Sequence, residues 1–168
     1  AANFAQGDII TTVLTCARGE TILLRLDTTL PRSYSRDFTV RGTKGLYMQD
    51  TNSVFLDGDE EAFEPVKYYA KALNNAVKFE DEYLPDIWKS VTEEMLKAGH
   101  GGMDWFAYMG FTNALINGEE MPIDVYDAAT WQAVAVLSEM SIKQGGAPQI
   151  MPDFTNGKWF KRARKDVC

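Results

Sequence analysis

Two short stretches of this sequence concentrate side chains that could bind a ligand. The first is Pro31-Arg32-Ser33-Tyr34-Ser35-Arg36, which brings two hydroxyls, a phenol and two guanidinium groups together. Proteins bind sugars with such groups, through hydrogen bonds to the sugar hydroxyls and stacking of sugar C–H faces on aromatic rings. A solvated turn with two ordinary surface arginines explains the same residues equally well. The residues alone leave both interpretations open.

The second stretch, Gly99-His100-Gly101-Gly102-Met103-Asp104, holds the single histidine of the chain. Its glycines would let a ligand or another backbone approach closely, so His100 could line a pocket. The alternative, which the residues alone favour, is that His100 bonds carbonyls at the end of one helix while Asp104 caps the next. In either case we expect Asp104 to act as a helix cap.

The glycine spacing of this second stretch is similar to that of a dinucleotide-binding loop, but the context differs. Such a loop follows a buried strand and ends in Gly or Ala, whereas this one follows a polar segment, residues 93–97, and ends in Asp104. An acid at that place would repel a pyrophosphate, so we expect no cofactor to bind this chain. The sequence also lacks a nucleophile elbow, a metal-binding His pair and a Cys–His arrangement, and we assign no catalytic residue and no metal site.

Composition fits one compact domain and excludes two classes of partner. The chain has 168 residues, is 45% hydrophobic and carries a net charge of −7. Its single basic cluster, residues 158–165, is too small for a nucleic-acid surface, and no apolar run has the length of a membrane span. Two cysteines, Cys16 and Cys168, form neither a disulfide framework nor a zinc pattern. The cellular compartment stays open.

Five short β-like segments in the first third of the chain predict an antiparallel meander. They cover residues 9–16, 21–28, 37–42, 46–50 and 53–58. The connection from Thr28 to Arg36 is longer and contains Pro31, so we expect it to leave the sheet edge and to offer its side chains to another group. Because Val13 and Leu23 are apolar, we also expect a homo-oligomeric contact through the sheet face that carries them.

The rest of the chain is predicted to be mainly helical. Residues 59–85 should be irregular or partly helical, and the apolar spacing predicts helices over 86–97, 103–116 and 127–143. Residues 148–152 should be extended, with the option of an edge strand. Strands first and helices later, without alternation, predict an α+β fold with a largely antiparallel open sheet and helices packed on one face.

Several motifs taken together resemble one known family. They are Gly7-Asp8, the segment TILLRLDTT from Thr21, the cluster from Pro31 to Arg36, His100-Gly101-Gly102-Met103-Asp104, Asn117-Gly118, the segment PIDVYDAATW from Pro122, and Gly145-Gly146-Ala147-Pro148 followed by Pro152-Asp153-Phe154-Thr155. With these motifs the chain resembles the C-terminal domain of the Gfo/Idh/MocA-type oxidoreductases. It is most similar to the branch classified as glycoside hydrolase family 109, the NAD-dependent α-N-acetylgalactosaminidase-like proteins.

This resemblance implies a two-domain parent protein. An N-terminal Rossmann domain, absent here, would bind NAD, and residues 1–168 would form a single C-terminal domain that closes the sugar pocket and mediates oligomerisation. The cofactor would transiently oxidise a sugar hydroxyl and thereby permit elimination and water addition, before it is restored. Because the Tyr/His catalytic segment would lie upstream, this chain alone is expected to be inactive.

The resemblance also implies which residues of this chain meet the substrate. Tyr34 would contact the sugar, and Arg36 and His100 would line the same pocket. Whether the parent is a hydrolase or a sugar dehydrogenase stays open. A stand-alone, non-catalytic dimeric or sugar-binding module is the alternative hypothesis.

Overall fold

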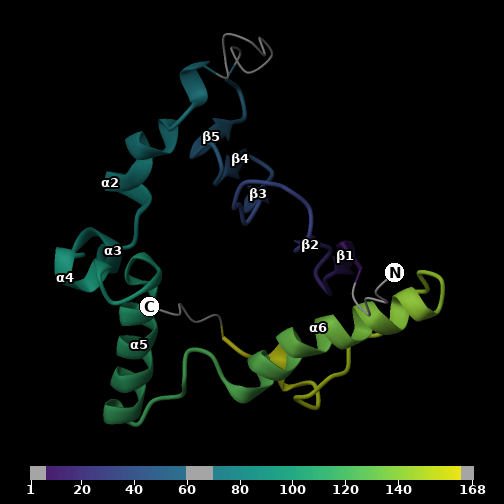
Figure 1. Ribbon diagram of the computed structural model, residues 1–168. Helices are drawn as coiled ribbons and strands as arrows, with labels where there is room; N and C mark the ends of the chain where they lie inside the picture. The colour runs from purple at the N-terminus through teal and green to yellow at the C-terminus, as the bar shows by residue number, and fades with distance from the viewer. Residues whose placement is uncertain (1–6, 60–69, 164–168) are drawn as a thin grey trace. The chain divides into compact units, whose positions relative to one another are not determined.

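The computed structural model of the chain describes residues 7–59 and 70–163 (Figure 1). The chain divides after Lys89 into two compact units, Ala1–Lys89 and Ser90–Cys168. Every strand of the described part lies in the first unit, and both long helices lie in the second. The predicted α+β class with open antiparallel sheet is confirmed.

The first unit begins with a β-hairpin. In it β1 (Ile9–Thr15) pairs antiparallel with β2 (Thr21–Asp27), and the register places Val13 directly opposite Leu23. The turn between the strands is tight because Gly19 has a φ of 99°, in the region that favours glycine. Alternate residues of β1 are exposed and half-buried, as expected for a strand with two different faces.

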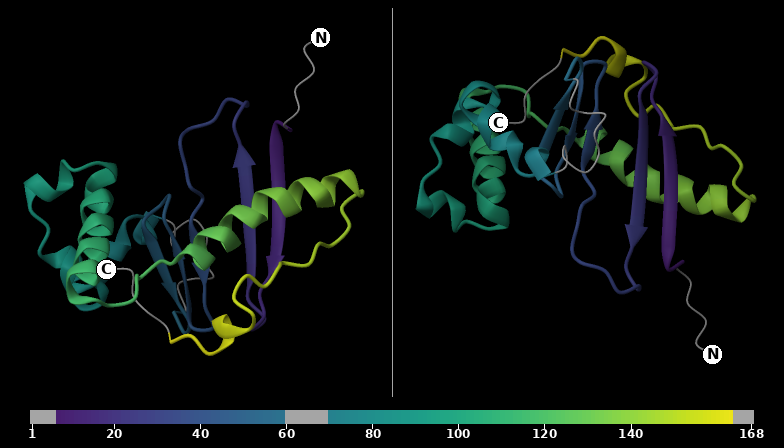
Figure 2. Two further views of the ribbon diagram at one scale, coloured as in Figure 1. Left: turned by 90° about the horizontal axis from the view of Figure 1, so that it is seen from below. Right: turned by 90° about the horizontal axis from the view of Figure 1, so that it is seen from above.

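A second, separate sheet follows along the chain. It consists of β3 (Thr39–Arg41), β4 (Gly45–Met48) and β5 (Ser53–Leu56), paired antiparallel in that order. No ladder joins β2 to β3 in the described residues, so the predicted meander is interrupted at the connection 28–38, the long loop that leaves the hairpin in Figure 2. Pro31 in this connection has no N–H to give to a ladder, which is one physical reason for the interruption.

The free edge of β5 is covered by η2 (Asn75–Phe79) and the residues just before it. The Asn75 amide accepts a hydrogen bond from Val54 N–H (2.7 Å) and donates one to Val54 C=O (2.8 Å). Beside it, the hydroxyl of Ser53 donates to the carbonyl of Ala72 (2.7 Å), and both residues are buried. One side-chain amide therefore takes the place of a neighbouring strand at this edge.

Short helices lead out of the first unit. The stretch predicted to be irregular or partly helical, residues 59–85, is described at Asp59 and from residue 70 on, and it contains η2 and α2 (Glu80–Tyr83). Residues 60–69 of that stretch lie outside the described residues. The unit ends with α3 (Asp86–Lys89).

The prediction of one continuous helix over residues 86–97 was wrong. After α3 the chain leaves the helical conformation, and α4 (Glu93–Leu96) begins anew. The backbone of Thr92 is extended, and its hydroxyl accepts a hydrogen bond from Met95 N–H at 3.3 Å. Thr92 therefore caps α4, and its capping preference overrides the helical spacing of the apolar residues around it.

The second unit contains α5 (Met103–Asn117) and α6 (Val125–Lys143). The predicted end of α5 is confirmed, because Gly118 adopts the left-handed conformation (φ 67°) that closes a helix. By contrast, α6 begins at Val125, ahead of the predicted Asp127. None of the helices in the described ranges combines the length and the apolar character needed to cross a membrane.

After α6 the chain turns back and runs beside the helix toward its first turn (Figures 1 and 2). Residues 148–152 form no strand there, so the optional edge strand is absent from this described segment. A short turn of 3-10 helix, η4 (Lys158–Phe160), follows. Residues 164–168, which include the end of the basic cluster and Cys168, lie outside the described residues.

Candidate functional site

Two of the three predicted sugar-binding residues, Tyr34 and Arg36, contact each other in the β2–β3 connection. The Arg36 Nε–H donates to the Tyr34 hydroxyl oxygen at 3.1 Å, and Tyr34 is 84% exposed. Because the phenol oxygen accepts from Arg36, its own hydrogen remains available to a ligand oxygen. The other guanidinium N–H groups of Arg36 have no partner among the described residues. The pair therefore presents hydrogen-bond donors outward.

The residues around this pair hold the loop in one conformation. The Ser35 hydroxyl donates to the Asp50 carboxylate, whose oxygens lie 2.7 and 2.6 Å away, and accepts from Asp37 N–H at 2.8 Å. Asp37 has a φ of 49°, an unusual value for a non-glycine residue. Since Asp50 follows β4, Ser35 ties the loop to the turn between β4 and β5.

Arg32, the other guanidinium of the cluster, faces the protein. Its Nε lies 3.6 Å from Asp27 Oδ2 at the end of β2, and its NH2 group donates to the Ser35 carbonyl at 3.3 Å. The side chain of Asp27 is only 14% exposed, and its Oδ1 has no hydrogen-bond partner in the described part of the chain. Arg32 thus holds the loop to the end of β2, and its positive charge offsets part of the cost of burying the Asp27 carboxylate.

His100, the third predicted residue, belongs to the second unit, where it opens η3 (His100–Gly102) ahead of α5. Its Nδ1 lies 2.9 and 3.0 Å from the two carboxylate oxygens of Asp104. The prediction that Asp104 caps α5 was wrong, because Gly102 is the N-cap and no side chain bonds there. A pocket shared by His100 with Tyr34 and Arg36 stays a prediction.

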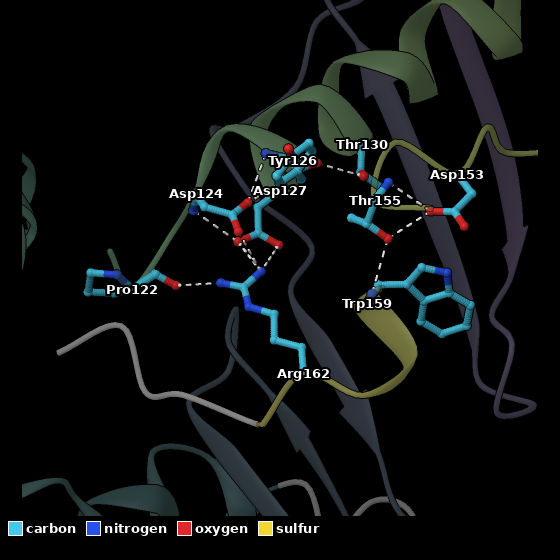
Figure 3. A network of polar contacts seen from close by, with 9 residues as sticks. All are labelled: Pro122, Asp124, Tyr126, Asp127, Thr130, Asp153, Thr155, Trp159 and Arg162. Carbon is cyan, nitrogen blue, oxygen red and sulfur yellow. Dashed lines mark hydrogen bonds and ion pairs between the residues drawn. The ribbon is translucent and has the colours of Figure 1, made fainter. Parts of the chain in front are cut away.

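The sequence interpretation missed a polar network at the start of α6 (Figure 3). The Asp124 carboxylate accepts hydrogen bonds from the N–H groups of Tyr126 (2.8 Å) and Asp127 (3.0 Å), and Asp127 accepts one from Asp124 N–H (3.1 Å). This is a reciprocal capping box in which Asp replaces the usual Glu or Gln at the third helical position. The spacing Asp124-x-x-Asp127 was the available signal.

Arg162 joins the returning tail to this cap. Its NH1 group lies 2.9 and 2.8 Å from the Asp127 carboxylate oxygens, and its NH2 group donates to the Pro122 carbonyl at 3.3 Å. Partial burial acts to raise the pKa of Asp127, but the hydrogen bonds from Arg162 and Asp124 N–H outweigh it and hold this pKa below its ordinary value. The same hydrogen bond to Asp127 raises the pKa of the Arg162 guanidinium.

A second tail motif precedes Arg162. Asp153 accepts hydrogen bonds from Thr155 N–H and hydroxyl, both at 2.8 Å, and from Gly157 N–H at 2.5 Å. The Thr155 hydroxyl oxygen accepts from Trp159 N–H at 3.0 Å. These bonds, first those from Thr155, lower the pKa of Asp153. The polar groups in Figure 3 bond one another, which marks the tail motif and the helix cap as structural.

Other features of the described residues offer no stronger site. A shallow depression of about 320 Å³ on the first unit is lined by backbone and side chains of β3, β4 and β5 and contains none of the predicted site residues. The residues that line it are Arg41, Gly42, Gly45, Leu46, Phe55, Leu56 and Asp57. No group of three or more His, Cys, Asp or Glu side chains within 7–59 and 70–163 is placed to hold a metal ion.

Comparisons with known proteins agree with the resemblance. The family model for the glycosyl hydrolase 109 C-terminal domain matches residues 1–161. A glycosyl hydrolase family 109 protein of Stenotrophomonas maltophilia (strain K279a) is 45% identical over 159 residues, 95% of this chain and 33% of that protein. An alpha-N-acetylgalactosaminidase of Tannerella forsythia is 40% identical, over 95% of this chain and 32% of that enzyme. An alpha-N-acetylgalactosaminidase of Shewanella oneidensis (strain MR-1) is 34% identical, over 93% of this chain and 33% of that enzyme.

The chain spans about a third of the length of these relatives. Its match to the family model nevertheless extends from the first residue across both compact units. The chain belongs to glycosyl hydrolase family 109, of which it is a C-terminal domain.

Proposed function

We propose that this chain provides the substrate pocket and the assembly surface of an NAD-dependent sugar-processing enzyme, either a glycosidase or a sugar oxidoreductase. The Tyr34–Arg36 pair carries the proposal, because it presents a free phenol hydrogen and free guanidinium donors on a loop held by Ser35. Two relatives are named alpha-N-acetylgalactosaminidases, so an N-acetylgalactosamine derivative is the first substrate to test.

The residues of this chain would bind and orient the sugar. The Tyr34 hydroxyl would donate its hydrogen to a sugar oxygen, while Arg36 fixes the direction of the phenol by donating to the Tyr34 hydroxyl oxygen. Holding a reactant in one orientation before the reaction lowers the entropic part of the barrier. The chain needs no acid or base of its own for this role.

The Gly-rich turn at residues 99–102 does not fit NAD. The Gly-rich turn at 99–102 follows the helix α4, and the carboxylate of Asp104 stands in the first turn of α5. A pyrophosphate bound at the N-terminus of α5 would be attracted by the free N–H groups of the helix but repelled by this negative charge. When bound elsewhere in the parent protein, NAD would supply the transient oxidation of the sugar, and we assign no redox step to this chain.

Assembly is the second part of the proposal. Val13 and Leu23 are paired across the hairpin and are 63% and 59% exposed. We propose that a second copy of the chain covers this apolar pair. Most homodimers have C2 symmetry, in which the same patch of each copy meets its equivalent on the other. Replacing Val13 with Asp should convert a dimer to a monomer in sedimentation velocity. A wild-type chain that sediments only as a monomer would remove this part of the proposal.

The sugar-binding part is tested by titrating N-acetylgalactosamine into the chain and following NMR shifts. Replacing Tyr34 with Phe removes one donated hydrogen bond and should weaken binding about tenfold, or roughly 1.4 kcal/mol. Tyr108 of α5 is also well exposed (74%), and replacing Tyr108 with Phe is the matched control that should leave the affinity unchanged. Equal affinities for both variants would exclude Tyr34 as a sugar ligand.

Calorimetry with NAD separates a pocket domain from a cofactor-binding one. We expect no saturable heat when NAD is added to the 168-residue chain. Micromolar binding of NAD would contradict the assignment of the cofactor to another domain.

A further inference from the structure

The chain contains two Asn-Gly dipeptides, Asn117-Gly118 and Asn156-Gly157, and both lie in the second compact unit. An asparagine side chain can react with the backbone nitrogen of the next residue. Because glycine has no Cβ, its nitrogen can approach the amide carbon of the preceding side chain without a steric clash. Asparagine is accordingly among the residues that limit the chemical lifetime of proteins at high temperature. Each dipeptide is therefore a candidate site of spontaneous deamidation.

The two dipeptides share the features that give solvent and the attacking nitrogen access. Both asparagines and both glycines are exposed, so water reaches them. Gly118 and Gly157 each have a positive φ, 67° and 77°, and a Cβ built on either would meet no atom within 4 Å. Steric access therefore does not distinguish the two sites, whereas the hydrogen bonds of the attacking nitrogen do.

The backbone nitrogen of Gly157 is held by a carboxylate. Its N–H donates to Asp153 Oδ2 at 2.5 Å, and the other oxygen of this carboxylate accepts from the N–H and the hydroxyl of Thr155, both at 2.8 Å. A hydrogen bond to an ionised group is about twice as strong as one between neutral groups. Before the nitrogen can attack the Asn156 side chain, this bond must break. The turn thus protects Asn156.

The backbone nitrogen of Gly118 is held more weakly. Its N–H donates to the Leu115 carbonyl with a nitrogen–oxygen distance of 3.4 Å, longer than an ordinary hydrogen bond between these groups. Asn117 is also the last residue of α5, and the terminal turn of a helix opens more readily than its interior. The conformation and the free nitrogen that the reaction needs are therefore reached at low cost here.

We propose that Asn117 is a deamidation site of the folded chain and that Asp153 protects Asn156 from the same reaction. The Gly118 nitrogen loses its proton to the solvent and bonds to the amide carbon of the Asn117 side chain. The side-chain nitrogen takes a proton from the solvent and leaves as ammonia, which closes a five-membered cyclic imide. Water then adds to one of the two imide carbonyl carbons and opens the ring. One opening gives aspartate, and the other gives isoaspartate, in which the backbone runs through the former side chain.

Either product changes the end of α5. An aspartate places a negative charge where the carbonyl groups of the helix already carry negative partial charge. An isoaspartate also lengthens the backbone by one carbon just before Gly118, whose left-handed conformation directs Glu119 N–H to the Ala114 carbonyl at 2.8 Å. We expect Asn117→Asp, which reproduces the charge alone, to lower the protection of the Glu119 amide against hydrogen exchange about two- to fivefold.

Peptide mapping by mass spectrometry measures both sites in one sample. The folded chain is incubated for several days at mildly alkaline pH, where loss of the backbone proton is favoured. Exchange of the side-chain amine for a hydroxyl gives a small increase in mass, which is resolved for each peptide. We expect the product to form about tenfold faster at Asn117 than at Asn156, the factor that a stronger hydrogen bond on the attacking nitrogen provides. Equal rates, or a faster reaction at Asn156, would overturn the proposal.

The chain in denaturant shows how fast the two dipeptides react without a fold. Because both are Asn-Gly, we expect their rates to be similar there. If Asn117 stays unmodified in the folded chain over the time in which the denatured chain reacts at both sites, the end of α5 protects it and the proposal fails.

A substitution in the turn tests the protecting group. Asp153→Ala frees the Gly157 N–H and should raise the rate at Asn156 toward that at Asn117, with the rate at Asn117 unchanged. Glu139→Ala is the matched control, because it removes an exposed carboxylate of the same unit whose partner is a lysine, and it should change neither rate. A reaction at Asn156 that stays slow in Asp153→Ala would show that this carboxylate does not protect it.

Discussion

Replacing Arg162 with Ala should release the C-terminal tail from α6. Arg162 makes a two-point contact with the Asp127 carboxylate and a further hydrogen bond to the Pro122 carbonyl. Its NH1 group also lies 3.4 Å from Asp124 Oδ2 at the N-cap of α6. The capping box between Asp124 and Asp127 does not use Arg162, so the helix start itself should persist in the variant.

The size of the effect follows from the exposure of the pair. Fully exposed ion pairs contribute about 0 to 1 kcal/mol, and hydrogen bonds to charged groups contribute about 1.5 to 3 kcal/mol. The side chains of Arg162 and Asp127 are 30% and 31% exposed, between these two cases. We therefore expect Arg162→Ala to lower the free energy of unfolding by about 2 kcal/mol. In a chain of this length that loss lowers the midpoint of thermal unfolding by about 4 to 8 °C. Arg162→Lys keeps the charge but loses the separate hydrogen bond that NH2 donates to the Pro122 carbonyl, so it should lose about half as much.

Thermal unfolding followed by circular dichroism gives the midpoint, and amide hydrogen exchange shows where protection is lost. Exchange should accelerate in residues 153–163 and at the first turn of α6, with α5 unaffected. Lys158→Ala, which removes an exposed cation of the same tail, is the control and should leave both measurements unchanged. If Arg162→Ala matched the control, the contact between Arg162 and Asp127 would contribute nothing to the stability of the tail. If Arg162→Lys matched the wild type, the hydrogen bond to the Pro122 carbonyl would contribute nothing.

Three further outcomes follow from the same kind of contact. The pKa of Asp127 is lowered in the folded chain, so its stabilisation is present above the unfolded pKa, about 3.9, and is lost as the pH falls through the folded value. The protection factors of the tail amides, which correct for the intrinsic pH dependence of exchange, should therefore fall on acidification, and Asp127→Asn should abolish that dependence. Asn75→Ala leaves the Val54 N–H and C=O without partners and should cost about 1 to 3 kcal/mol in chemical denaturation, whereas Asn113→Ala, at an exposed position of α5, should cost nothing. Gly99→Ala places a Cβ against Asp104 and should disturb the His100–Asp104 contact, seen as a shift of the His100 ring resonances in NMR, while Gly118→Ala, with an open surrounding but also a positive φ, should reduce stability without that shift.

The strands and long helices could be predicted because their signals are local. Alternating apolar residues and turn glycines define β1, β2 and the ends of α5, and each of these agrees with the structure. The single helix expected over 86–97 failed because a capping hydroxyl at Thr92 competes with apolar spacing, and spacing alone does not decide that competition. The break between the two sheets was only partly predictable: Pro31 indicates where the chain leaves the sheet edge, but whether β3 pairs with β2 depends on contacts over a long connection.

The residue types of the candidate site could be predicted from the sequence, but the contacts that these residues make could not. The cluster from Pro31 to Arg36 could be singled out by its hydroxyls and guanidinium groups, yet nothing in its sequence distinguishes the two arginines. In the structure Arg32 turns to Asp27 and the Ser35 carbonyl, whereas Arg36 turns to Tyr34. Asp27 precedes the cluster along β2, and only the folded loop brings its carboxylate within reach of Arg32.

The completeness of hydrogen bonding separates the structural networks from the proposed binding residues. At the start of α6, the Asp127 carboxylate is used by Arg162 and by Asp124 N–H, so that network leaves little to offer a ligand. Tyr34 and His100 are different, because each makes one contact that fixes its orientation and keeps one polar atom without a partner among the described residues. A polar group that is oriented but unsatisfied costs little while water reaches it, and it becomes favourable when a ligand supplies the missing partner. On this ground the phenol hydrogen of Tyr34 is the atom at which we propose to look first for a ligand.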